Sequence, residues 1–71
     1  MIRNGDRTAE AERRLADLGI QASVESGGSG GEVAVIRPSE GAVAPLLGEL
    51  RDSAVEQCRA AGFFYVALEL Y

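Results

Sequence analysis

The sequence has no histidine, no lysine and no tryptophan, and each of its seven basic residues is an arginine. These absences remove the commonest general base and metal ligand, the usual Schiff-base nucleophile and the lysine of phosphate-binding loops. A single cysteine, Cys58, allows neither an internal disulfide nor a thiolate metal cluster. We therefore expect no catalytic residue, no metal and no cofactor in this chain, which is unlike an independent enzyme.

The charge and the apolar runs of the chain disfavour two classes of partner. A net charge of -4 provides no basic stripe to neutralise phosphates, so nucleic acid is not expected as a partner. No apolar run approaches the roughly 18 residues of a membrane span. The first six residues contain no apolar segment typical of a signal peptide. These features predict a cytoplasmic protein with no membrane partner.

The size and composition predict one small folded domain over residues 1–71. The chain is 46% hydrophobic and 25% charged, which is ordinary for a globular protein and unlike a disordered one. Its length of 71 residues is close to the lower limit at which a single hydrophobic core suffices.

Apolar periodicity and glycine positions divide the chain into helices and strands. Apolar residues at helical spacing run up to Leu18-Gly19, and they predict a helix over about residues 8–18, capped by Asp6 or Thr8. The elements expected after it are strands over residues 20–25 and 32–37, a helical turn over 43–50, a helix capped by Asp52 or Ser53 and ended by Gly62, and a strand over 63–71.

This order, α-β-β-α-α-β, predicts a small α+β fold. Two strands joined by a glycine-rich loop form a hairpin, and the third strand pairs beside one of them after a helical crossover. The expected architecture is a two-layer sandwich, with a three-stranded sheet and the helices on one of its faces.

The segment 63–71 is apolar on both faces of the expected strand. A strand of this kind is usually covered on both sides, and a chain of this length covers it only once. One face is expected to pack on the chain's own helices and comprises Phe64, Val66, Leu68 and Leu70. The other face is predicted to be an interface and comprises Phe63, Tyr65, Ala67, Glu69 and Tyr71.

Two further features favour structural roles over chemical ones. The glycines of residues 27–31 precede a strand, whereas phosphate-binding glycines precede a helix, so a mobile hairpin loop is the stronger interpretation. Cys58 shares helical spacing with Ala54 and Ala61, which is typical of a buried structural cysteine.

Charged residues in the first expected helix allow two interpretations. Glu10 and Arg14 stand at i, i+4 spacing, which is typical of a solvated helix face with an ion pair. Alternatively, Glu12, Arg13 and Arg14 form a weak ligand-binding set.

Two segments resemble the C-terminal domain of the PP-loop, ATP-dependent sacrificial sulfur transferases. Residues 60–70 (Ala-Ala-Gly-Phe-Phe-Tyr-Val-Ala-Leu-Glu-Leu) are similar to that family's closing helix and Gly-Phe-x-Tyr-Val-x-Leu-Asp-Leu strand. Residues 11–20 (Ala-Glu-Arg-Arg-Leu-Ala-Asp-Leu-Gly-Ile) are similar to its Ala-Glu-x-x-Leu-x-x-Leu-Gly-Phe segment. The resemblance covers most of this chain but only the small C-terminal domain of the family.

The polar positions depart from that family's pattern. The Ser-Gly-Gly-x-Asp-Ser signature of the nucleotide-binding domain is absent, and Cys58 does not correspond to the sacrificial cysteine. Ser23 and Glu25 stand where the family has an Arg-x-Arg pair, and Ile36 replaces a glutamate. Glu12 matches a polar family position. The resemblance therefore implies a stand-alone, degenerate relative that keeps the apolar framework.

The resemblance and the apolar terminal strand lead to two main functional hypotheses. The first is a non-catalytic accessory or assembly module that forms a homo-oligomer or docks on a separate PP-loop, sulfur-transfer or ATP-using enzyme. The second is a detached subunit of a split sulfur transferase that contributes Glu12, Arg13 or Arg14 to a shared active site. A small-ligand-binding domain is a further alternative. The all-arginine basic residues suggest a bacterial source.

Overall fold

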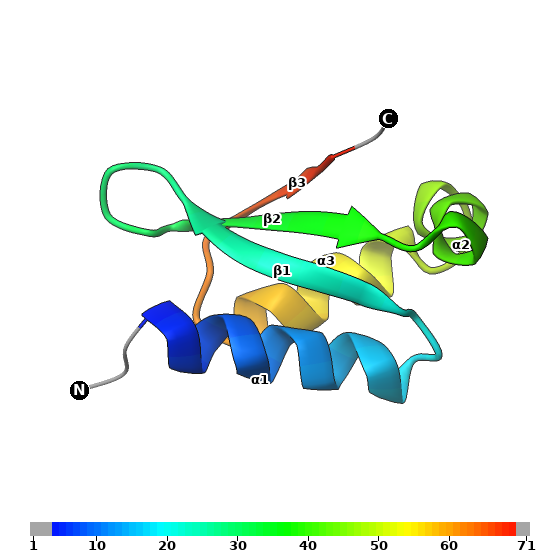
Figure 1. Cartoon of the computed structure of the whole chain (residues 1–71), viewed down its shortest axis with the longest axis horizontal. Helices are drawn as coiled ribbons and strands as arrows, with labels where there is room; N and C mark the ends of the chain where they lie inside the picture. Colours follow the sequence, from blue (N-terminus) through cyan, green and yellow to red (C-terminus); the bar gives the residue numbers. More distant parts are fainter. Residues whose placement is uncertain (1–3, 70–71) are drawn as a thin grey trace.

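A computed structural model describes residues 4–69, and it places the helices on one face of a β-sheet (Figure 1). The predicted α+β class and the order of the elements are confirmed. In chain order the elements are α1 (Asn4–Asp17), β1 (Ala22–Gly27), β2 (Val33–Pro38), the 3-10 turn η1 (Glu40–Ala42), α2 (Val43–Leu47), α3 (Arg51–Ala60) and β3 (Tyr65–Leu68).

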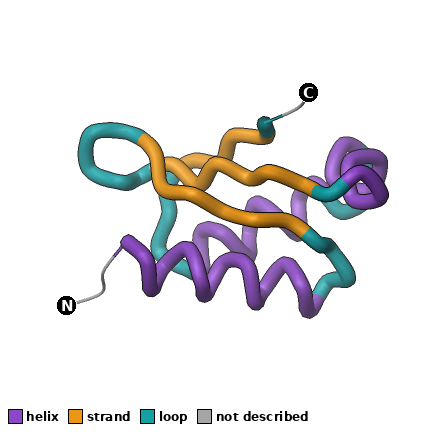
Figure 2. Tube along the Cα trace, in the orientation of Figure 1, coloured by secondary structure: helices purple, strands orange, loops and turns teal. Residues whose placement is uncertain are grey.

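The sheet within residues 4–69 has three strands in the order β1-β2-β3 (Figure 2). β1 and β2 form the predicted antiparallel hairpin, in which Val24 is opposite Ile36. β3 pairs with β2 in parallel, and Ala34 is opposite Val66. Both β1 and β3 are consequently edge strands, since each has a partner strand on one side only.

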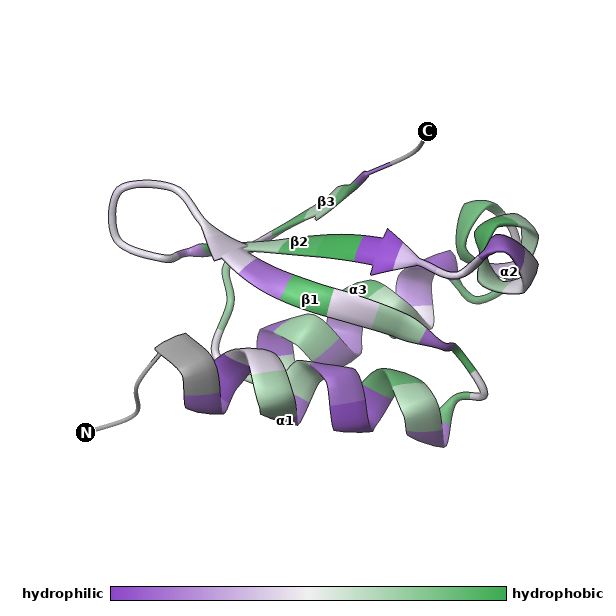
Figure 3. Cartoon of the chain, in the orientation of Figure 1, coloured by the Kyte–Doolittle hydropathy of each residue, from purple (hydrophilic) through white to green (hydrophobic). Residues whose placement is uncertain are grey.

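The two faces of the sheet differ in how they are covered. Val24, Ala34 and Ile36 point towards the helices and are buried. The ribbon of α1 lies beneath β1, whereas no helix of the described residues covers the opposite face, which we call the outer face (Figures 1 and 3). Residues of β2 alternate between half-buried and buried along the strand because its side chains alternate between these two faces.

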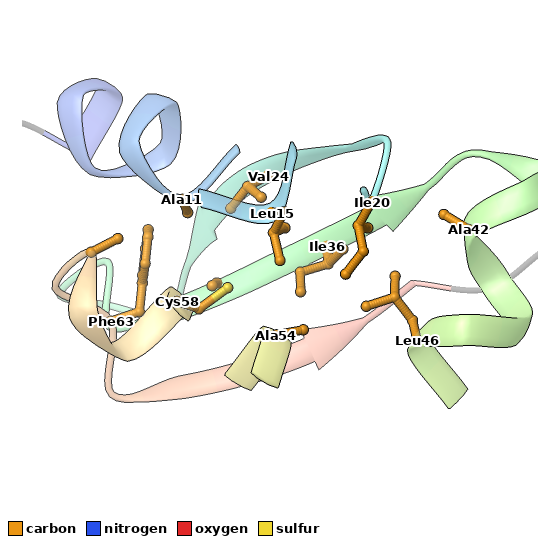
Figure 4. Close-up of a cluster of buried hydrophobic side chains, with 12 residues drawn as sticks. Ala11, Leu15, Ile20, Val24, Ile36, Ala42, Leu46, Ala54, Cys58 and Phe63 are labelled. Atoms are coloured by element: carbon orange, nitrogen blue, oxygen red, sulfur yellow. The ribbon is translucent and has the colours of Figure 1, made fainter. Parts of the chain in front are cut away.

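The core lies between the sheet and α1, α2 and α3 (Figure 4). The predicted stripe of α1 is present, since Ala11 and Leu15 are completely buried and Leu18 packs against the same cluster. The buried residues of this cluster are Ala11, Leu15, Ile20, Val24, Ala34, Ile36, Ala42, Leu46, Ala54, Cys58, Ala61 and Phe63.

The two longer helices end in the same way, with a glycine in the left-handed region followed by a buried apolar residue. In α3, the N–H of Gly62 (φ 109°) donates to the Arg59 carbonyl at 3.0 Å, and the N–H of Phe63 donates to the Cys58 carbonyl at 3.2 Å. These two bonds form a Schellman motif, which commonly includes an apolar contact of the residue after the glycine. Phe63 therefore belongs to the end of α3.

The end of α1 repeats this arrangement. Gly19 (φ 83°) donates to the Ala16 carbonyl at 2.9 Å, and Ile20 donates to the Leu15 carbonyl at 2.9 Å. Ile20 is buried, like Phe63. Each helix thus delivers one large apolar side chain into the core immediately before the chain turns towards a strand.

The predicted strand over residues 63–71 was wrong at its beginning. The strand begins at Tyr65, and the alternation that placed Phe63 on the interface face does not apply before that residue. Phe63 is 2% exposed, and the Arg7 guanidinium lies 4.9 Å from the centre of its ring, whereas Phe64 is 70% exposed. Phe63 is therefore a core residue. The predicted positions of Leu70 and Tyr71 lie outside the described residues.

The predicted helix starts also need correction. α1 begins at Asn4 instead of near Thr8, so Asp6 and Thr8 lie within the helix, where Asp6 suits the positive N-terminal end. α3 begins at Arg51 after Leu50, with no side-chain cap from Asp52 or Ser53. Leu50 is tied to the preceding helix by a bond from its N–H to the Pro45 carbonyl at 3.0 Å, so the chain continues directly from α2 into α3.

Candidate functional site

The three charged residues predicted as a weak ligand-binding set all have side-chain partners within the chain. The Glu12 carboxylate accepts a hydrogen bond from the backbone N–H of Val24 at 2.7 Å. Glu12 therefore uses its charge to hold α1 against β1, and this contact is a structural role for the residue.

The two arginines of the set are paired with acidic or amide side chains. Arg13 donates to Glu10 at 2.7 Å, and this hydrogen bond holds the pKa of Glu10 below its ordinary value of 4.5. Arg14 donates to Glu10 at 2.8 Å and to Gln57 of α3 at 3.1 Å, so it joins two helices. The predicted i, i+4 pair of Glu10 and Arg14 is present.

The surface depression beside β1 does not bring the three residues of the predicted set together. Glu12 lines this shallow depression together with Ser23 and Arg37, whereas Arg13 and Arg14 do not line it.

Replacing Glu12 with alanine should destabilise the fold. Glu12→Ala removes a charge-assisted acceptor from a partly buried N–H, which we expect to lower the free energy of unfolding by about 1–3 kcal/mol. Urea denaturation measures this loss, and hydrogen exchange at the Val24 amide should accelerate in parallel. Glu12→Gln keeps an acceptor oxygen and should recover part of the stability. Unchanged exchange at Val24 in the alanine variant would contradict this role.

Cys58 has the properties of a structural cysteine. Its side chain is completely buried in the core on α3, and burial raises the pKa of the thiol from 9.0 to about 11. The thiolate, which is the reactive form, is therefore disfavoured at neutral pH. Among the described residues, no group of three or more acidic or cysteine side chains is placed to hold a metal ion. No helix in this part of the chain is long and apolar enough to span a membrane.

The glycine-rich hairpin loop is organised around the carboxylate of Glu32. The N–H of Gly30 donates to Glu32 at 2.8 Å, and Gly31 donates to the Gly28 carbonyl at 3.4 Å. Gly28 has φ 85°, a conformation that favours glycine, and a Cβ built there would also displace the Glu32 carboxylate, which lies 2.6 Å away. The Glu32 carboxylate already accepts the hydrogen bond of a loop N–H, and its negative charge would repel a phosphate. Both properties argue further against the phosphate-binding interpretation.

The two edges of the sheet differ in how their backbone groups are satisfied. At the β1 edge, the N–H of Val24 points away from β2 and is bonded to Glu12. At the β3 edge, two N–H groups point towards β2. The N–H of Tyr65 donates to the Glu32 carbonyl at 3.1 Å, and the N–H of Glu69 donates to the Ile36 carbonyl at 2.8 Å. In a parallel ladder the intervening residues of β3 direct their N–H and C=O groups to the other side. The outward groups of β3 belong to Val66 and Leu68.

The outer face beside β3 combines an apolar area with a charged area. At the hairpin end, Tyr65 is 65% exposed and lies in register with Val33, and Ala67 lies in register with Val35. At the opposite end, Arg37 bridges Glu25 of β1 at 2.9 Å and Glu69 at 2.7 Å. The predicted interface residues Tyr65, Ala67 and Glu69 therefore share one accessible face.

An apolar pocket opens on the inner side of β3. Its volume is about 320 Å³, at the small end of the range for ligand pockets. Val66 and Leu68 line it but stay half-buried, because α3 covers them only partly. The pocket is lined by Ile36, Leu46, Leu47, Arg51, Ala54, Val55, Val66 and Leu68.

Sequence reasoning missed two components of this site. It assigned Val66 and Leu68 to the face that packs on the chain's own helices, and residue spacing does not reveal how far a short helix reaches across a sheet. It also overlooked Arg37 as the centre of a charge cluster. Aligning the strands of the expected hairpin would have placed Arg37 close to Glu25, since cross-strand neighbours of opposite charge pair favourably.

No protein-family model and no curated protein matches this chain.

Proposed function

We propose that the chain is a non-catalytic assembly module that associates with other protein chains through the β3 side of its sheet. The observation that carries this proposal is the difference between the two edges. On the β1 edge, the Val24 N–H donates to the Glu12 carboxylate. On the β3 edge, the backbone N–H and C=O groups of Val66 and Leu68 point outwards beside apolar side chains. Exposed strand edges of this kind are templates for pairing with another chain.

The internal contacts of the charged residues support an assembly role over a contribution to a shared active site. Glu12 and Arg14 join α1 to β1 and to α3, and Arg13 pairs with Glu10 and Asp17. A residue that contributes to catalysis in another subunit needs a group directed outwards. Glu12 and Arg14 instead stabilise the fold that presents β3, and the exposed Arg13 is paired within α1.

The resemblance to the sulfur transferase C-terminal domain is compatible with this role and suggests a second kind of partner. The matched residues include Leu15, Gly19 and Gly62, which form the core and the two helix ends. They maintain the framework and carry no ligand chemistry. A separate sulfur-transfer or ATP-using enzyme is a proposal that rests on this resemblance alone.

Sedimentation equilibrium tests the assembly proposal in its simplest form, which is self-association. Across a concentration range of roughly 1–500 µM, we expect the mean mass to rise from 7.5 kDa towards that of two chains. The contact is small, so association in the micromolar range is expected. A mass that stays at 7.5 kDa throughout this range would contradict self-association.

A further inference from the structure

We propose that two copies of the chain pair β3 against β3 in antiparallel orientation, with Ala67 facing Ala67 of the second copy on a two-fold axis. This inference rests on the proposed assembly function and specifies its partner and its register. It is based on three properties of β3: the direction of its backbone groups, the charges beside it and the pocket beneath it.

The direction of the backbone groups limits the registers that are possible. In an antiparallel pair, residues with outward N–H and C=O groups must stand opposite each other as hydrogen-bonded pairs. On β3 these residues are Val66 and Leu68. With Ala67 at the axis, Val66 of each copy is opposite Leu68 of the other, so both residues donate and accept in both copies. With Val66 at the axis, Leu68 is instead opposite Phe64, whose N–H is already bonded to Glu32.

The charges and side-chain sizes on the outer face favour the same register. Tyr65 of each copy is opposite Glu69 of the other, so its hydroxyl faces a carboxylate that Arg37 already holds at 2.7 Å. A register centred on Glu69 would place two carboxylates directly opposite each other, which is unfavourable. Ala67 is small enough to stand at the axis, where the side chains of a non-hydrogen-bonded pair approach most closely.

The inner face provides the apolar part of the contact. Val66 and Leu68 are half-buried in the single chain and line the pocket of about 320 Å³. In the proposed register they meet Leu68 and Val66 of the second copy at the lip of that pocket. The pockets of the two copies become neighbours across the axis, and the apolar surface left exposed by α3 is removed from water. A second copy therefore satisfies the outward groups of β3, matches the charges beside it and covers its apolar side chains.

Disulfide cross-linking tests the register directly. Opposed residues of a non-hydrogen-bonded pair have Cα atoms about 4.5 Å apart, which a disulfide spans. We expect Ala67→Cys to form a covalent dimer rapidly under mild oxidation. The matched control is Ser23→Cys, because Ser23 is exposed on β1. This variant should remain a monomer under the same oxidation. The chain without either substitution should also remain single because its Cys58 is buried.

Mixed variants test the antiparallel orientation. Tyr65→Cys and Glu69→Cys should cross-link efficiently when mixed, because these positions are opposite each other in the proposed pair. Glu69→Cys alone should not cross-link, because its two copies are separated by several residues along the strands. Cross-linking of Glu69→Cys alone, without the mixed product, would overturn the register.

Charge exchange at the axis provides a test without covalent chemistry. Ala67→Glu alone and Ala67→Lys alone should each weaken association at least about tenfold, since each places like charges opposite each other. An equimolar mixture of the two should restore dimers. Restoration supports the pairing, and failure of the mixture to associate overturns it.

These measurements separate the register from the assembly proposal. If the unmodified chain sediments as a dimer but Ala67→Cys cross-links no faster than Ser23→Cys, the register is wrong and assembly stands. A disulfide formed by Val35→Cys but not by Ala67→Cys would instead place two outer faces together. If the unmodified chain stays at single-chain mass and no variant cross-links, both proposals fail.

Discussion

Phe63→Ala should remove roughly half of the free energy of unfolding of this chain. Truncating a buried phenylalanine costs about 3–5 kcal/mol. The total stability of a domain of this size is only about 4–10 kcal/mol. The Arg7 guanidinium lies 4.9 Å from the centre of the Phe63 ring, and Phe63 directly follows Gly62, the glycine that ends α3. Loss of the Phe63 ring therefore removes core volume and weakens the contact between α1 and the end of α3.

The adjacent residue provides a matched control for this prediction. Phe64→Ala removes the same group from a side chain that is 70% exposed, and we expect a change within about 0.5 kcal/mol. Urea denaturation followed by circular dichroism measures both variants at low concentration, where association contributes little. Equal losses for the two variants would show that Phe63 is not the core residue of this pair.

Ala34→Lys should abolish folding altogether. Ala34 is completely buried on β2, the central strand, and its side chain points towards the helices. A lysine there would place a charged group, with no acidic partner, inside an apolar cluster. Burying an unpaired charge costs several kcal/mol, and the added volume cannot be accommodated without moving α1 or α3.

Ala67→Lys makes the same change on the opposite face of the sheet and should be tolerated. Ala67 is exposed on β3, so its substitution leaves the core intact. Thermal unfolding monitored by circular dichroism should show a cooperative transition for Ala67→Lys and none for Ala34→Lys. A folded Ala34→Lys variant would contradict the assignment of the two faces. The folded Ala67→Lys variant also validates its use in the charge-exchange experiment.

Much of the fold could be predicted because the local signals agree with one another. Gly19 and Gly62 mark the ends of the two longer helices, and both adopt the left-handed conformation that favours glycine there. The glycine-rich loop between two apolar segments predicted the hairpin. In a chain this small, three strands and their helices have few compact arrangements, so the element order largely determines the layers.

The phase of β3 could not be read from alternation alone. Alternation requires the strand to begin where the apolar run begins, but Phe63 is still bonded to the last turn of α3. The useful signal was the repeated glycine-plus-apolar pair at the two helix ends. Ile20 and Phe63 occupy equivalent positions after Gly19 and Gly62, and both are buried. The predicted strand over residues 20–25 began too early for the same reason, because Ile20 is bonded to the last turn of α1 and β1 begins at Ala22.

The role of Glu12 was also beyond the reach of the sequence. Its spacing from Arg13 and Arg14 places it on a charged helix, which is compatible with solvent, a ligand or a neighbouring strand. The choice depends on the distance between α1 and the β1 edge, which is a property of packing. In the fold, the carboxylate lies 2.7 Å from the Val24 nitrogen. Tyr65, Ala67 and Glu69 were predictable as one face because they follow the period of two within β3.

The hydrogen bond of Glu12 to β1 also has a consequence for how the sheet could grow by adding further copies. If copies could add at both β1 and β3, each addition would expose a fresh edge, and the product would be an open-ended fibre. Because the Val24 N–H is already bonded to Glu12, the β1 edge is a poorer template than the β3 edge for a third copy. Glu12 therefore disfavours growth at the β1 edge, and its loss is expected to favour polymerisation as well as unfolding.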